Sequence, residues 1–244
     1  MISGVEQLVD LLRRSAHTVV LTGAGVSAES GVPTFRDAQT GLWAKYRPEE
    51  LATPEAFAAN PTLVWSWYAS RRAKLHSVDP NPGHLALAAF ESILPVFTLI
   101  TQNVDGLHQR AGSQQVIEFH GNIHRTVCSQ PGCAGVWQPA DEREPPLCPD
   151  CGAFMRPGVV WFGESIPEQA LNDSIEAVQK CDVFITAGTS SVVHPAAGLV
   201  SIAADRGAAI VEINIDDTPA TSAADVVIKA RSGEALALIL QQLE

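Results

Sequence analysis

Six short apolar runs, rich in β-branched and aromatic residues, recur along the chain and constrain its fold more than any other feature. They lie at residues 17–22, 95–101, 115–119, 182–187, 208–214 and 224–228. The runs are nearly continuous rather than alternating, which is typical of strands buried on both faces of a parallel sheet. Helical patterns separate many of them, at residues 84–93, 167–180, 195–206 and 233–244. This alternation predicts an α/β protein with a Rossmann-like, doubly wound parallel sheet.

Two segments interrupt the alternation, and we expect both to protrude from the sheet. Residues 37–80 are rich in Trp, Tyr, Pro and charge, and we interpret them as a loop followed by a helical insertion. Residues 121–158 contain four of the five cysteines and form a predicted small module. The segments 1–36, 81–120 and 159–244 make up the predicted Rossmann-like domain. The crevice between the insertions and the sheet is then the expected ligand site.

Composition narrows the class of protein. A net charge of −11 over 244 residues argues against general nucleic-acid binding, which needs a surface rich in Lys and Arg. No stretch approaches the ~20 apolar residues that cross a bilayer. Glu6 and Asp10 interrupt the N-terminal segment, which therefore does not resemble a signal peptide. We expect a cytoplasmic protein without membrane association, and a monomer.

The four clustered cysteines are spaced as metal ligands. Cys128 and Cys133 form one pair and Cys148 and Cys151 a second, each in a turn that contains Pro or Gly. Two such pairs can supply a tetrahedral site for one structural Zn²⁺ without an open position for water. Two disulfides are the alternative, which a reducing cytoplasm disfavours. His124 is a possible substitute ligand that four thiolates make unnecessary, and Cys181 is expected in the core.

A glycine-rich turn follows the first predicted strand. In VVLTGAGVSAESGVPTFR (19–36), Gly23 and Gly25 permit a tight turn, and Ala28 takes the third, small position. The amides at the start of the following helix attract phosphate. Directly after a strand, this pattern indicates a dinucleotide site.

The site departs from that of a hydride-transferring enzyme. The acidic residue that would close the second strand and hold the adenosine ribose is missing. A second turn, AGTSSVVHP (187–195), offers polar donors from Gly188, Thr189 and Ser190. Asn214, at the end of the run 208–214, is expected to supply the missing ribose contact.

Several motifs occur together in a specific order: the 19–36 segment, TQNVDGLH (101–108), EFHG (118–121), the four cysteines, VVWFGE (159–164) and GTSS. With them the chain resembles the sirtuin family of NAD-dependent protein lysine deacylases over essentially its whole length. The resemblance implies NAD⁺ as cofactor, bound by the Rossmann-like domain, with residues 37–80 including the cofactor loop. It also implies the reaction: the acyl-lysine carbonyl oxygen attacks C1′ of the nicotinamide ribose, nicotinamide leaves, and free lysine and O-acyl-ADP-ribose result.

The resemblance also assigns roles to residues. His120 matches the general base, a role that suits the ordinary pKa of histidine. Gln102, Asn103 and Asp105 match contacts to the ribose and nicotinamide, with Asp105 at the carboxamide. Further expected cofactor contacts are Ala24, Ala28, Phe35 and Arg36. The segment VVWFGE is expected to supply an edge strand for the substrate peptide, with contacts from Val160, Phe162 and Gly163.

One branch of the family carries Tyr-x-x-Arg in the acyl pocket and accepts succinyl and malonyl groups. Tyr68 and Arg71 match this pattern in SWYASRRAKL (66–75), and Ala52 matches the small residue that accompanies it. An Arg fork and a Tyr hydroxyl can bind the carboxylate of such an acyl group, which would otherwise be costly to bury. We expect removal of acetyl and also of succinyl or malonyl groups. Arg72 and Lys74 are expected to face solvent.

Other functions remain open at this stage. An ADP-ribosyltransferase would use the same site with another nucleophile, and would release nicotinamide without loss of the acyl group. A non-enzymatic NAD- or zinc-binding interaction module is disfavoured by the presence of His120 and Asn103. A dehydrogenase is disfavoured by the missing acidic residue, and formation of NADH would mark it.

Overall fold

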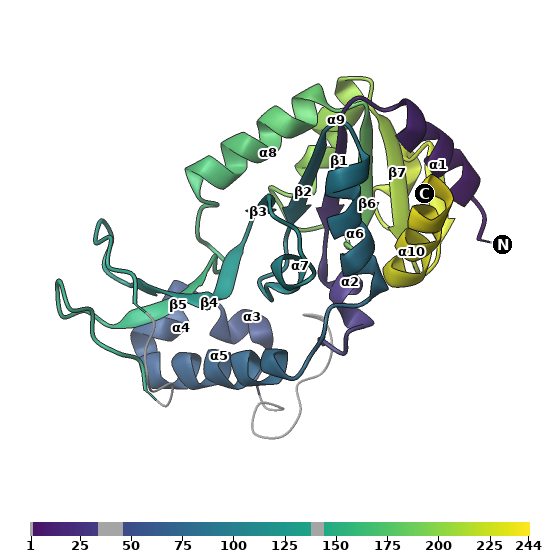
Figure 1. The fold of residues 1–244 in the computed structure, drawn as a ribbon. Helices are drawn as coiled ribbons and strands as arrows, with labels where there is room; N and C mark the ends of the chain where they lie inside the picture. The colour runs from purple at the N-terminus through teal and green to yellow at the C-terminus, as the bar shows by residue number, and fades with distance from the viewer. Residues whose placement is uncertain (1, 34–45, 138–143) are drawn as a thin grey trace.

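A six-stranded parallel sheet forms the centre of the protein in the computed structural model, which describes residues 2–33, 46–137 and 144–244 (Figure 1). Its strands are β1 (Thr18–Thr22), β2 (Phe97–Thr101), β3 (Val116–Glu118), β6 (Val183–Ala187), β7 (Ala209–Asn214) and β8 (Val226–Lys229). Each run predicted as a strand coincides with one of them, although β8 extends one residue beyond the predicted run 224–228. The order is β3-β2-β1-β6-β7-β8, the Rossmann order when the strands are numbered along the chain. The strand order therefore reverses between β1 and β6, which is where ligands bind in such sheets.

Helices cover both faces of the sheet. One face packs against α1 (Val5–Arg14), α6 (Pro82–Ile93) and α10 (Ser232–Leu243), and the other against α8 (Glu168–Lys180) and α9 (Gly198–Asp205). Neighbouring residues of β1 serve opposite cores, because Val20 joins the first cluster while Val19 and Leu21 join the second. Burial on both faces explains the continuous apolar runs of the sequence. Short elements complete this sheet region: α2 (Ala24–Ala28), α7 (Leu107–Arg110) and the 3₁₀ turn Thr221–Ala223.

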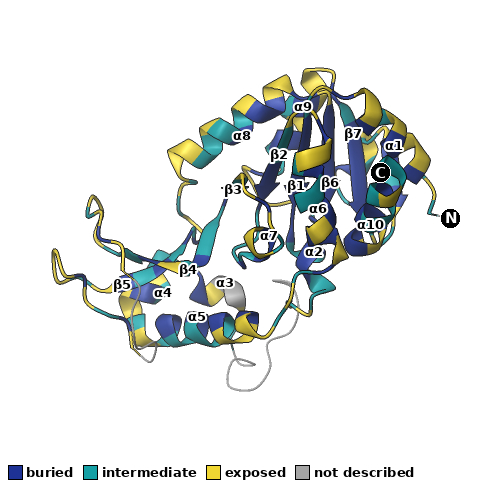
Figure 2. Cartoon of the chain, in the orientation of Figure 1, coloured by how far each residue is buried: buried dark blue, intermediate teal, exposed yellow. Residues whose placement is uncertain are grey.

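A second body of structure extends away from the sheet (Figure 1). It contains α3 (Pro48–Leu51), α4 (Pro54–Ala59), α5 (Pro61–His76) and the antiparallel strands β4 (Gly121–Cys128) and β5 (Met155–Val159). We call residues 46–76, 121–137 and 144–164 the small region. Its apolar cluster includes Trp67, Tyr68 and Trp161, and Figure 2 shows exposed residues along the loops beyond β4 and β5.

Two sequence-based expectations for this region are wrong. The strand expected over 159–164 ends at Val159, because the Glu164 carboxylate accepts the N–H of Trp161 at 2.8 Å and the Glu164 N–H bonds back to the Trp161 carbonyl at 3.0 Å. The segment is thus a closed turn. Arg72 does not face solvent: it is 4% exposed, and its guanidinium lies 4.7 Å from the centre of the Trp65 ring. Lys74 is exposed as expected.

Among the described residues, no helix has the length and apolar character needed to cross a membrane.

Candidate active site

The two glycine-containing turns at the carboxyl edge of the sheet touch each other through backbone atoms. Gly23 donates its N–H to the carbonyl of Ala187 at 3.0 Å, and Gly25 donates to Gly188 at 2.8 Å. A Cβ atom on Gly23 would lie 2.7 Å from the Thr189 Cα, closer than real side chains allow. Glycine is therefore required here for the approach of two strand ends, in addition to any ligand.

Polar side chains after β2 converge on Ser27, a residue that the sequence analysis did not single out. Its hydroxyl donates to Asp105 Oδ2 at 2.7 Å and accepts from Asn103 Nδ2 at 3.1 Å. His84 Nε2 lies 3.3 Å from the same oxygen. Asp105 is buried, and its Oδ1 accepts the Leu107 N–H at 2.9 Å. Ser27 thus holds the two side chains predicted to contact ribose and nicotinamide in fixed positions.

His84 is neutral in this network. Its Nδ1 accepts the backbone N–H of Asn81 at 3.3 Å, so Nε2 carries the proton and donates to Ser27. Burial lowers the pKa of His84 to about 4, although the charge of Asp105 opposes the shift. Ser27 lies inside the motif GVSAESG, so its position beside the glycines could have marked it as a site residue. His84 is 57 residues away, and nothing in the sequence near it indicates this contact.

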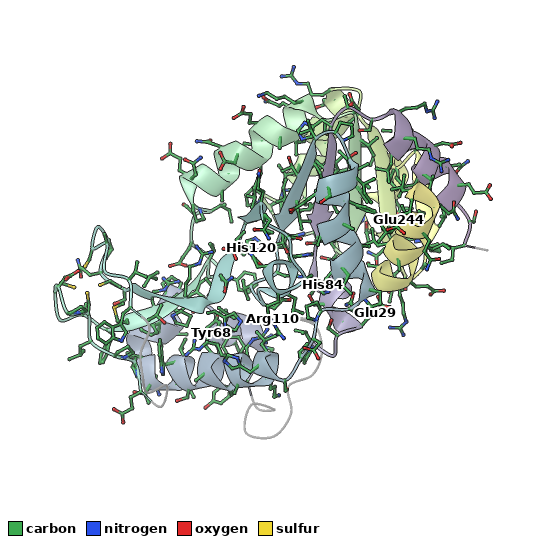
Figure 3. The ribbon with its side chains drawn as sticks, viewed as in Figure 1. Glu29, Tyr68, His84, Arg110, His120 and Glu244 are labelled. Carbon is green, nitrogen blue, oxygen red and sulfur yellow. The ribbon has the colours of Figure 1, made fainter. Side chains whose placement is uncertain are left out.

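His120 lies where the chain passes from β3 to β4, between the sheet region and the small region (Figure 3). Its Nδ1 is 3.1 Å from the carbonyl oxygen of Gln102. Because a carbonyl only accepts, Nδ1 carries the proton and Nε2 keeps its lone pair in the neutral ring. Burial lowers the pKa of His120 below its ordinary 6.5, with the bond to Gln102 opposing the shift. The ring is therefore neutral at pH 7 and can accept a proton at Nε2.

The adenosine side of the predicted site is linked across three strands. Gln102 Nε2 donates to Thr189 Oγ1 at 2.9 Å, and Asn214 Nδ2 donates to the Thr189 carbonyl at 2.7 Å. The structure thus brings the ends of β2, β6 and β7 together. Ala24 and Ala28 are the first and last residues of α2, Ser190 lies in the turn after β6, and all three are half-buried. Phe35 and Arg36 lie outside the described residues.

The residues predicted for the acyl pocket lie in one cluster of the small region. Tyr68 is 4% exposed and shares its apolar cluster with the buried Ala52 (Figure 3). Burial raises the pKa of Tyr68 to about 12, and the nearby Arg71 opposes the shift. Burial also lowers the pKa of Arg71, with Tyr68 and Asp105 opposing it. The structure therefore places Arg71 within electrostatic reach of both the Tyr68 phenol and the Asp105 carboxylate.

The turn 160–164 connects the residues of the predicted acyl pocket to His120. Val160 donates its N–H to the His120 carbonyl at 2.9 Å, and Phe162 donates to the Ala52 carbonyl at 2.9 Å. Phe162 is 45% exposed, so its side chain is accessible to a binding partner. Gly163 has a φ of 86°, a backbone conformation that favours glycine. The N–H groups of Val160, Trp161 and Phe162 already have acceptors, so a partner peptide cannot pair with these three donors as it would with the donors of a free edge strand.

Four thiols at the tip of the small region meet the geometric demands of zinc. All four sulfur atoms, of Cys128, Cys133, Cys148 and Cys151, lie within 4.8 Å of one another. The Cys128–Cys151 and Cys133–Cys148 separations are 3.4 and 3.7 Å. A tetrahedral zinc site with Zn–S bonds of about 2.3 Å needs sulfurs about 3.8 Å apart, whereas a disulfide needs about 2 Å. The donor set therefore fits a structural Zn²⁺.

The remaining cysteine and the proposed spare ligand serve other purposes. Cys181 is buried and its thiol donates to the Val178 carbonyl, as expected of a core residue. The Nε2 of His124 lies 3.1 Å from the Asp105 carbonyl, so this ring binds the loop that follows β2.

Strand order and paired turns define a dinucleotide-binding protein of the Rossmann type. A sequence model of the Sir2 family matches residues 23–195. The NAD-dependent protein deacylase 2 of Pyrobaculum aerophilum is 50% identical over 237 residues, covering 97% of this chain and 95% of that protein. A Sir2 homologue solved in complex with NAD is 46% identical, with a TM-score of 0.92 over 98% of this chain and 93% of that chain. A variant Sir2 homologue with 2′-O-acetyl ADP-ribose, also 46% identical, gives 0.90 over 98% and 96%. The chain belongs to the Sir2 family.

Proposed function

We propose that the protein is an NAD-dependent protein-lysine deacylase, and that His120 is its general base. The observation that carries the proposal is the single hydrogen-bonding state available to His120: Nδ1 is fixed by Gln102, and Nε2 remains basic. Membership of the Sir2 family and relatives named as NAD-dependent protein deacylases support it. The partners are then acylated lysine side chains.

Each group has a defined task in this proposal. Bound NAD⁺ supplies a ribose carbon from which nicotinamide can leave. Asp105 and Asn103, held by Ser27, would orient the nicotinamide amide and the ribose, since both are fixed before a ligand arrives. His120 accepts a proton from a ribose hydroxyl at Nε2. Gly23, Gly25, Gly188, Thr189 and Asn214 would hold the remainder of the cofactor at the reversal point of the strand order.

The acyl preference is a second part of the proposal: the pocket takes dicarboxylic acyl groups such as succinyl and malonyl. The support is the buried Tyr68 beside Arg71, because this tyrosine brings a polar hydroxyl into an otherwise apolar cluster. A carboxylate that enters such a site needs charged and neutral donors to replace water. The small Ala52 leaves room for the longer chain.

The test combines cofactor and acyl group. Peptides of one sequence carrying acetyl-lysine or succinyl-lysine are incubated with and without NAD⁺, and nicotinamide and free lysine peptide are counted by mass spectrometry. We expect one nicotinamide for each acyl group removed, and none without NAD⁺. Acyl loss without NAD⁺ consumption would contradict the proposal, and nicotinamide release with the acyl group intact would favour an ADP-ribosyltransferase.

A further inference from the structure

The indole of Trp161 controls the hydrogen-bonding state of Tyr68. Its Nε1–H donates to the phenol oxygen at 3.0 Å, with Trp161 only 3% exposed. An indole N–H can only donate, so the phenol oxygen is the acceptor and its own hydrogen must point elsewhere. Within the residues that the structure describes, this is the hydrogen bond that the phenol makes. Its O–H is thus left to donate to a group that enters the pocket.

Trp161 is itself held firmly on both sides. The Arg156 guanidinium lies 3.4 Å from the centre of the indole ring and pairs with both carboxylate oxygens of Glu164. Glu164 also accepts the Trp161 backbone N–H, and the Phe57 ring packs against the indole at 5.3 Å. The indole direction is therefore set by the same ion pair that closes the turn 160–164.

We propose that Trp161 is a positioning residue for acyl selectivity, because its N–H fixes the Tyr68 hydroxyl as a donor to the terminal carboxylate of the acyl group. The inference rests on the proposed function. An acetyl group has no carboxylate and gains nothing from this donor, so the effect acts on selectivity rather than on the reaction itself. The raised pKa of Tyr68 keeps the phenol protonated, and thus a donor, throughout the working pH range.

Trp161→Phe tests the assignment, since it keeps an aromatic ring beside Arg156 and removes the indole donor, together with some ring volume that the matched control also removes. The measurement is kcat/KM for succinyl-lysine and acetyl-lysine peptides of one sequence at saturating NAD⁺. We expect the succinyl-to-acetyl ratio to fall about three- to tenfold, the size of one lost hydrogen bond. The matched control is Trp65→Phe, another fully buried tryptophan of the small region, whose ring stacks on Arg72 rather than on the proposed carboxylate ligand Arg71. It should leave the ratio within about twofold.

A double-mutant cycle separates positioning from packing. Tyr68→Phe should lower the ratio at least as much as Trp161→Phe, and in that background Trp161→Phe should change the ratio by less than about twofold. Multiplicative effects, or equal loss of both activities in Trp161→Phe, would overturn the inference. So would an unchanged ratio in Tyr68→Phe, which holds even if Trp161→Phe does not fold. A wild-type protein that removes acetyl but not succinyl groups with NAD⁺ overturns this inference together with the proposed acyl preference, and leaves the proposed NAD-dependent deacylation standing. Failure to remove either group with NAD⁺ overturns the proposed deacylation itself.

Discussion

The sheet region and the small region are stabilised by different means. In the sheet region, alternate residues of one strand are buried against helices on opposite faces, so one element contributes to two cores. The small region has one apolar cluster, and arginines take part in its packing: Arg72 stacks on Trp65 and Arg156 on Trp161. Four thiols at its tip replace the core that its loops lack. Continuous burial on two faces stabilises the sheet, whereas the small region depends on a few specific contacts.

The proposed enzyme binds its cofactor in the sheet region and recognises the acyl group in the small region, so the two tasks depend on differently stabilised structure. The proposed cofactor contacts lie at strand ends, where the surrounding sheet leaves the backbone little freedom. The proposed acyl contacts lie on α5 and on the turn 160–164, whose positions depend on side-chain pairs such as Arg156–Glu164. Loss of individual contacts should therefore alter substrate choice in the small region before it alters cofactor chemistry.

Removal of the metal should have the largest effect, because it should unfold the small region and leave the sheet region folded. Cys148→Ser deletes one of four thiolates, and structural zinc sites contribute on the order of 10 kcal/mol to folding. We expect loss of bound zinc, loss of deacylation, and loss of hydrogen-exchange protection in β4 and β5, with protection kept in β1, β6 and β7. The control Cys181→Ser should retain one zinc per chain by atomic absorption. Equal loss of protection in both regions would show that they unfold as one unit.

His120→Ala should abolish most of the activity without unfolding either region. Removal of a general base costs about 10²- to 10⁴-fold in rate, and the histidine lies outside the main cores, so the melting temperature should change little. Initial rates of nicotinamide release with an acetyl-lysine peptide give the measurement. His17→Gln, at the opposite edge of the sheet, is the control and should keep the wild-type rate. A fully active His120→Ala would remove the basis of the proposed mechanism.

Arg71→Met should affect one substrate class. Loss of the cation from a buried carboxylate site costs ~2–5 kcal/mol in succinyl removal, whereas acetyl removal should change far less. Lys74→Met, an exposed cation on the same helix, is the control for net charge. Rates with matched peptides decide the question, and an equal loss with both peptides would place Arg71 outside the acyl pocket.

The sheet was predictable because each strand leaves a recognisable pattern in its own segment of the sequence. Burial on two faces leaves continuous apolar runs in the sequence, and the polar residues after β2 necessarily lie at the carboxyl edge of the sheet. The cysteine pairs were predictable for a similar reason, since short spacing in turns brings thiols together. Resemblance to the family supplied the roles of His120, Asp105 and Tyr68.

The errors concern individual side-chain contacts that hydrophobic periodicity does not reveal. Arg72 was expected at the surface because charged side chains are usually solvated. Instead its guanidinium stacks on the Trp65 ring and donates to the carbonyl of Ile123. The segment 159–164 was expected to be a strand because it is apolar, yet Glu164 closes it into a turn. The bond between Trp161 and Tyr68 spans 93 residues, and no local pattern marks it. All three of these contacts lie in the small region, where the sequence was least informative.

The smallest expected effect is a shift in the pH dependence of kcat/KM. It tests whether the sheet region keeps His120 buried and neutral. Burial lowers the pKa of His120 below 6.5, so its basic form persists as the pH falls through 6.5 and is lost only at lower pH. We expect kcat/KM to be flat from pH 7 to pH 8 and to decline on an acidic limb with its midpoint below 6.5. The His17→Gln variant should show the same limb.

Acid also acts on stability, and the two effects must be separated. Burial lowers the pKa of His84 to about 4 and that of His108 to about 3. Below pH 6.5 the unfolded chain therefore binds more protons at these two residues than the folded chain, and the free energy of unfolding must fall as the pH falls. Melting curves at each pH show where this begins, and the rates are measured well below those temperatures. A limb with its midpoint at or above 6.5 under these conditions would mean that His120 is solvated, and that the sheet side does not hold it in the neutral state on which its proposed role depends.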